Sequence, residues 1–134
     1  MPDPVDVEKD LFGHLAAAHL RTGNMIRLRS RTDHRDLVLL STEDNVEYRV
    51  KEIDTKNECD LVNTPFGSAR DAVSRLFDVN RQWRVPLGDV EFTDREGGIA
   101  VTWRHLKANM RTLKWILEDD GSVFSEILGG AKKA

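Results

Sequence analysis

Apolar side chains near the N-terminus recur at the spacing of one helix face, at Val7, Leu11, Leu15 and Ala18. Asp3 is a suitable N-cap, Pro4 fits the first helical position, and Gly23 suits the left-handed residue that ends a helix. The pattern therefore predicts an amphipathic helix over residues 4–21 that buries one face. His19 extends the apolar stripe, so we expect a packed imidazole with a hydrogen-bond partner.

The hydrophobic period then changes to two, which is typical of half-buried strands. Ile26 and Leu28 share one face of the first strand, and arginines occupy the other face. A second strand over residues 36–40 is apolar enough to be buried on both faces, and residues 46–50 alternate again. Residues 59–62 suit a short fourth strand. Strands joined by short polar turns predict an antiparallel meander.

The second half of the chain begins with another helix, which Ser68 caps and which runs through Val79. An irregular segment around Pro86 follows, because proline removes a backbone donor. Residues 90–92 and 99–103 alternate in polarity around a glycine-containing turn, and this pattern predicts a hairpin.

Residues 104–118 fit two interpretations. As a strand they turn Leu113, Trp115 and Leu117 to one face, and as a helix they align Leu106, Met110, Leu113 and Leu117. Their content of Ala, Met, Leu, Lys and Arg favours the helix. We expect a last short helix over residues 122–128 and a frayed tail at residues 131–134.

The expected elements follow the order α-β-β-β-(β)-α-β-β-α-α, with strands and helices in separate runs. This order predicts an α+β fold: an antiparallel meander plus a hairpin, with amphipathic helices packed on one side. The chain has 134 residues, the length of one domain, so we expect residues 1–134 to form a single domain.

The composition indicates a globular protein, with 40% hydrophobic and 32% charged residues. No apolar run reaches the length of a transmembrane helix, and the acidic start differs from the basic start of a signal peptide. Cys59 is the only cysteine, which excludes an internal disulfide and a multi-thiolate metal site. We therefore expect a cytoplasmic protein with no membrane partner.

Motifs for catalysis or metal binding are absent from the sequence. His14 and His19 differ by five positions and point in different directions around a helix, unlike an i, i+4 ligand pair. Cys59 lies between two acidic residues, which disfavour a thiolate. We expect a non-enzymatic protein with no catalytic residue, cofactor or metal, although an active site assembled from distant residues stays open.

The net charge of −3 conceals blocks of opposite sign, because residues 21–35 and 100–117 are basic and residues 36–62 are acidic. On the predicted helix the cations lie 3, 4 and 3 positions apart along one stripe: Arg104, Lys107, Arg111 and Lys114. Such a stripe can neutralise phosphates, and a helix fits the DNA major groove. The alternative is a solvated helix face.

A second basic row is predicted on the first strand, where Arg27, Arg29 and Arg31 point away from the core. Their spacing of roughly 7 Å is near that of phosphates along one nucleic-acid strand. Glu47 and Glu52 on a neighbouring strand would instead turn the row into ordinary cross-strand pairs.

Two tryptophans indicate a different function. Trp115 projects away from the apolar face of its predicted helix, and Trp83 lies beside Pro86, so both are candidates for a protein interface. The first hypothesis is a small nucleic-acid-binding protein in a regulatory or accessory role. The second is a protein-interaction module, such as a homodimeric adaptor, a chaperone-like protein or a virion component. The expected partners are nucleic acid, a second copy of the chain or another protein.

Overall fold

The computed structural model describes residues 4–42, 47–98 and 100–108. Its first half contains one helix and four strands: α1 (Pro4–Arg21), β1 (Met25–Arg29), β2 (Arg35–Ser41), β3 (Tyr48–Asp54) and β4 (Cys59–Phe66). Its second half contains α2 (Ala69–Trp83), the 3-10 turn η1 (Leu87–Asp89), β5 (Glu91–Thr93), β6 (Val101–Thr102) and α3 (Trp103–Lys107). This order confirms the predicted α+β class.

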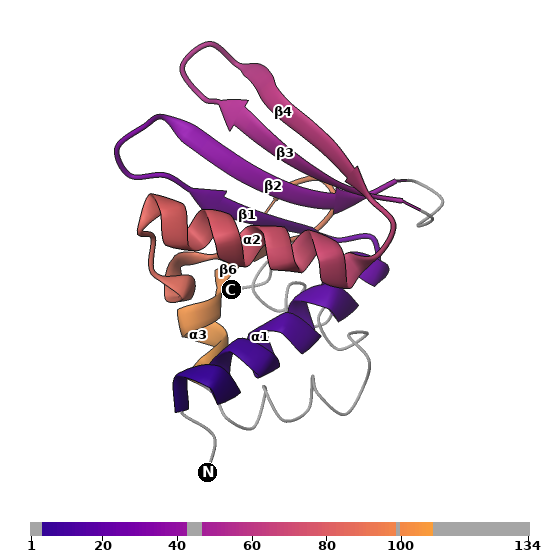
Figure 1. Ribbon diagram of the computed structural model, residues 1–134, viewed down its shortest axis with the longest axis vertical. Helices are drawn as coiled ribbons and strands as arrows, with labels where there is room; N and C mark the ends of the chain where they lie inside the picture. Colours follow the sequence, from indigo (N-terminus) through magenta and orange to yellow (C-terminus); the bar gives the residue numbers. More distant parts are fainter. Residues whose placement is uncertain (1–3, 43–46, 99, 109–134) are drawn as a thin grey trace.

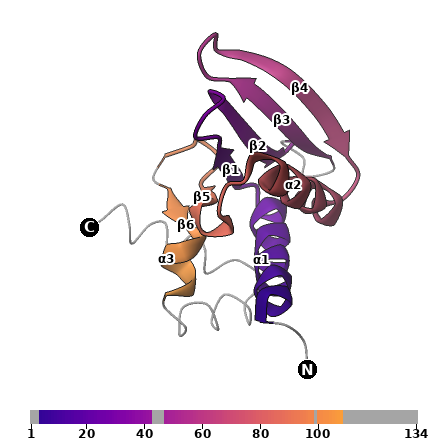
Figure 2. The same cartoon turned by 60° about the vertical axis from the view of Figure 1, so that its left-hand side comes forward.

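The strands form one antiparallel six-stranded sheet in the order β4-β3-β2-β1-β5-β6 (Figure 1). The meander and the hairpin are continuous because β5 pairs with the free side of β1, which places Ile26 opposite Phe92. Helices α1 and α2 lie against the same face of the sheet (Figure 2). The hydrophobic pattern predicts both parts of this sheet but not the join between them.

The first strand is shorter than its sequence pattern suggests. β1 ends at Arg29, so Arg31 lies in the following turn and is not the third outward residue of a strand. The predicted row of three arginines on one strand is therefore wrong for its last member, because pairing with β2 ends where Arg29 lies opposite Asp36.

The boundary between the hairpin and the next helix also differs by one residue. Trp103 does not continue the strand but begins α3, because the Thr102 hydroxyl accepts a hydrogen bond from the His105 backbone N–H at 3.2 Å and caps the helix. A helix therefore begins where the sequence favoured one. The remainder of the predicted helix, residues 109–118, lies outside the described residues, as does the predicted helix 122–128.

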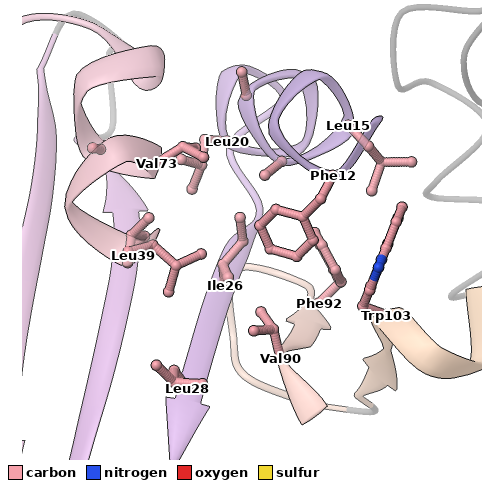
Figure 3. Close-up of a cluster of buried hydrophobic side chains, with 14 of the residues drawn as sticks. Phe12, Leu15, Leu20, Ile26, Leu28, Leu39, Val73, Val90, Phe92 and Trp103 are labelled. Atoms are coloured by element: carbon pink, nitrogen blue, oxygen red, sulfur yellow. The ribbon is translucent and has the colours of Figure 1, made fainter. Parts of the chain in front are cut away.

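The core lies between the two long helices and the sheet, and aromatic rings hold its centre (Figure 3). The Phe12 ring centroid lies 5.4 Å from that of Phe77, 5.6 Å from that of Phe92 and 5.3 Å from that of Trp103. These rings come from α1, α2, β5 and α3, so one side chain ties four elements together. Phe12, Phe92 and Trp103 are fully buried.

A buried histidine joins α1 to the middle of the sheet. His19 Nε2 lies 2.9 Å from the carbonyl oxygens of Met25 on β1 and Thr93 on β5, and its ring packs edge-on against Phe92. The expectation of a packed imidazole with a hydrogen-bond partner is thus confirmed. Burial lowers the pKa of His19 to about 4, although both carbonyl contacts act in the opposite direction.

The lowered pKa of His19 predicts that the protein loses stability in mild acid. Its folded pKa of about 4 lies below the ordinary value of 6.5, so the unfolded chain binds more protons between those two values. The contribution of neutral His19 to the stability of the fold is complete above pH 6.5 and is lost as the pH falls toward 4. We expect the free energy of unfolding to fall by about 2 kcal/mol between pH 7 and pH 5, measured by urea denaturation. A His19→Gln variant should lack most of this dependence, and an unchanged slope in that variant would contradict the assignment.

Candidate functional site

Both described cations of the predicted helix stripe are held by carboxylates of the same chain. Arg104 Nη1 lies 2.7 Å from Asp89 Oδ1, and Lys107 Nζ lies 2.6 Å from Glu8 Oε1. Glu8 Oε1 also accepts a hydrogen bond from the indole N–H of Trp103 at 2.9 Å. Glu8 of α1 therefore binds two side chains of α3, the indole of Trp103 and the ammonium of Lys107.

A glycine allows Arg104 to reach its partner. A Cβ atom added at Gly88 would lie 3.0 Å from Arg104 Nη2 and 3.3 Å from Arg104 Cβ, so the arginine crosses directly over the η1 backbone. Asp89 is the next residue, and its second carboxylate oxygen binds Arg31. One carboxylate thus joins the turn after β1 to helix α3.

The arginines of β1 also lie near carboxylates, Arg29 through a hydrogen bond and Arg27 through a longer contact. Arg29 Nε lies 3.0 Å from Glu91 on β5, and both Arg27 and Arg29 approach Asp36 of β2 at 3.9 Å. The expected partners Glu47 and Glu52 belong to the β3 side of the molecule. They are not the neighbours of this row because β1 lies between β2 and β5.

These contacts favour the charged form of each partner. The hydrogen bond from Arg104, followed by that from Arg31, lowers the pKa of Asp89, and the hydrogen bond from Lys107 is the main cause of the lowered pKa of Glu8. The hydrogen bond to Glu91 raises the pKa of Arg29. The basic side chains of β1, the turn after it and α3 are consequently almost balanced in charge by the carboxylates beside them.

The other predicted site residues contribute less to a surface. Arg111, Lys114 and Trp115 lie outside the described residues. Trp83, at the end of α2, is partly buried and packs against the core, so most of its ring is not free for a partner.

The outer edge of β4, which has no neighbouring strand among the described residues and is called its free edge below, is a second candidate surface. Seven of its eight residues are exposed, and Phe66 is the one that is partly buried. Leu61 is 45% exposed and Val62 41% exposed, and they are the exposed large hydrophobic side chains among the described residues. β4 reaches the core only at its last residue, since Phe66 packs against it, and the residues before Phe66 are exposed.

A groove between α1 and α2 is a third candidate. It has a volume of about 700 Å³, and basic side chains lie along its rim while small and apolar ones form its floor. Sequence reasoning missed this site because Arg21 and Arg70 come from different helices and share no motif. Their only signal is that each lies on a helix face beside buried positions.

Comparisons with known proteins leave the function open, since no family model matches the chain and neither curated proteins nor solved structures give a significant match. Within residues 4–42, 47–98 and 100–108, no group of three or more His, Cys, Asp or Glu side chains is arranged to hold a metal ion. No helix in the described part of the chain combines the length and apolar character needed to cross a membrane.

Asp89 offers a direct measure of how much the ion pairs stabilise the fold. Its two arginine partners keep more than half of their side chains exposed, at 67% for Arg31 and 61% for Arg104. Exposed pairs contribute little, so Asp89→Asn should lower the free energy of unfolding by less than about 1 kcal/mol in urea denaturation. Asp78→Asn, which removes an exposed pair within α2, is the matched control. A loss of several kcal/mol for Asp89→Asn, without a similar loss for Asp78→Asn, would contradict this expectation.

Proposed function

We propose that this protein is a non-enzymatic interaction module that binds a second copy of itself through the free edge of β4. The observation that carries the proposal is the exposure of this strand on both faces, including Leu61 and Val62. An edge strand presents unpaired backbone N–H and C=O groups, which another strand can satisfy.

The charge pattern of β4 supports a second copy as the partner. Asp60 is the only charged residue in the strand. In an antiparallel pair centred on Val62, Asp60 lies opposite Thr64 of the other copy, so no like charges meet. The two valines then face each other, and apolar surface is removed from water.

Two features of β4 limit the strength of such a pair. The register with β3 shifts between Glu52 and Ile53, which leaves Leu61 outside the pairing, and Pro65 has no N–H to donate. Only a short central stretch is then available. Stable complexes bury roughly 1,000 Å² or more, and a strand pair this short buries little surface by itself, so we expect a weak, concentration-dependent dimer.

Analytical ultracentrifugation over a range of concentrations tests the proposal. The average mass should rise from that of a monomer toward twice that value, and Val62→Lys should shift this transition to about tenfold higher concentration or more. The fold should be unaffected because Val62 is 41% exposed. Gln82→Lys adds the same charge on an exposed position of α2 and serves as the control. A purely monomeric protein at the highest concentration would reject pairing at β4.

Nucleic-acid binding by the basic residues is a second proposal, which the partial exposure of the arginines supports. Arg29, Arg31 and Arg104 keep 58%, 67% and 61% of their side chains exposed, so a phosphate can approach them. Any phosphate there competes with Asp89 and Glu91, which is why we rank this proposal second.

This second proposal has a distinct signature in a fluorescence titration with duplex DNA, single-stranded DNA and RNA. Binding should weaken steeply as salt rises, and Arg104→Ala should weaken it on all sequences. Asp89→Asn should strengthen it, since the competing carboxylate is gone. Absence of binding at low salt, or no effect of either substitution, contradicts phosphate contact at these residues.

A further inference from the structure

The groove between α1 and α2 has an apolar floor to which both helices contribute. Gly13 and Ala17 of α1 lie one helical turn apart, and so do Val73 and Phe77 of α2. A Cβ atom at Gly13 would lie 3.8 Å from the Phe77 ring, which is ordinary contact, so any longer side chain there would enter the groove. The glycine, which is unfavourable inside a helix, keeps this space open.

The aromatic ring of the floor is already engaged on its own side of the groove. Phe77 packs against Phe12 with centroids 5.4 Å apart, and the Lys9 ammonium lies 5.2 Å from its centroid. A base would therefore have to displace Lys9 from the ring in order to stack on it. The floor suits aliphatic side chains that pack between the helices.

The rim of the groove carries positive charge that the described residues do not neutralise. Lys9, Arg21 and Arg70 line it and are exposed, and none of them forms an ion pair within the described part of the chain. Among the described residues that line the groove, Asp10 is the only acidic one. Arg70 also lies in the first turn of α2, where the helix dipole disfavours a cation. This contrasts with the cluster around Asp89, in which each cation has a carboxylate partner.

We infer that this groove binds an acidic amphipathic helix of a partner protein. The apolar stripe of such a helix, with side chains at i, i+3 or i+4 and i+7, packs on the floor between α1 and α2. Carboxylates beside that stripe meet Lys9, Arg21 and Arg70, which supply the charge complementarity. The inference does not depend on pairing at β4, because no residue of that strand lines the groove.

The test uses a fluorescein-labelled peptide of about 16 residues, with leucine at helical spacing and glutamate at most other positions. Fluorescence anisotropy with the full-length chain should show binding, and replacement of the glutamates by glutamine should weaken it by about tenfold or more. Arg70→Glu should cause a loss of similar size. Lys56→Glu, an exposed substitution of equal charge in the β3–β4 turn, should leave the affinity within about twofold.

A matched pair of substitutions at Gly13 separates loss of the groove from loss of the fold. Gly13→Ala fits in ordinary contact and should keep the affinity, whereas Gly13→Met fills the groove and should lower it by about tenfold. Neither should lower the urea midpoint, because both residues favour helix over glycine. The inference is overturned if Gly13→Met and Arg70→Glu bind the peptide as the parent chain does. It is equally overturned if single-stranded DNA, and not the peptide, binds in a manner that both substitutions abolish.

Discussion

The pairing of β5 with β1 is the constraint on which the rest of the structure depends. It places a strand from the second half of the chain beside the first strand, and it gives the molecule one sheet and one core. Phe92 enters the core opposite Ile26 through this pairing, and Thr93 supplies one of the carbonyls that bind His19. Since the histidine also binds Met25, the same contact fixes α1 over the join.

The join also arranges the charges on the surface. Glu91 and Asp89 arrive next to the arginines of β1 and the turn after it, and α3 follows with Arg104 against the same Asp89. Cations that look free along the sequence are therefore paired, while Arg21 and Arg70 form no ion pair within the described residues. Exposed ion pairs stabilise a fold only slightly, so their main effect here is on the potential that a charged partner meets.

The candidate surfaces differ in what each offers a partner. The edge of β4 offers backbone hydrogen-bonding groups and two apolar side chains, with little charge. The groove between α1 and α2 offers apolar side chains under a cationic rim. These two chemistries suit different partners, which is compatible with a module that associates with itself and with another protein.

Local patterns along the chain were sufficient for most of the elements. The period of three to four around Leu15, the alternation around Leu28 and the Ser68 cap each depend on neighbouring residues, so the sequence determined them and the α+β class. The end of β1 and the start of α3 were missed by a residue or two, because hydrogen-bond partners outside the pattern set those boundaries. The fourth strand, predicted over residues 59–62, runs to Phe66, because its pairing with β3 continues until Phe66 lies opposite Tyr48.

The candidate site, in contrast, was decided by tertiary structure. Strand order brings Glu91 to Arg29 and Asp89 to Arg31, and in each pair the two residues lie far apart in the sequence. The groove exists because α1 and α2, which are far apart in the sequence, pack beside each other. Sequence by itself determined what each segment forms and which face it buries, because those properties are local. Only the fold decided which charged side chains form ion pairs and which form none within the described residues, because ion pairing depends on contacts between residues far apart in the chain.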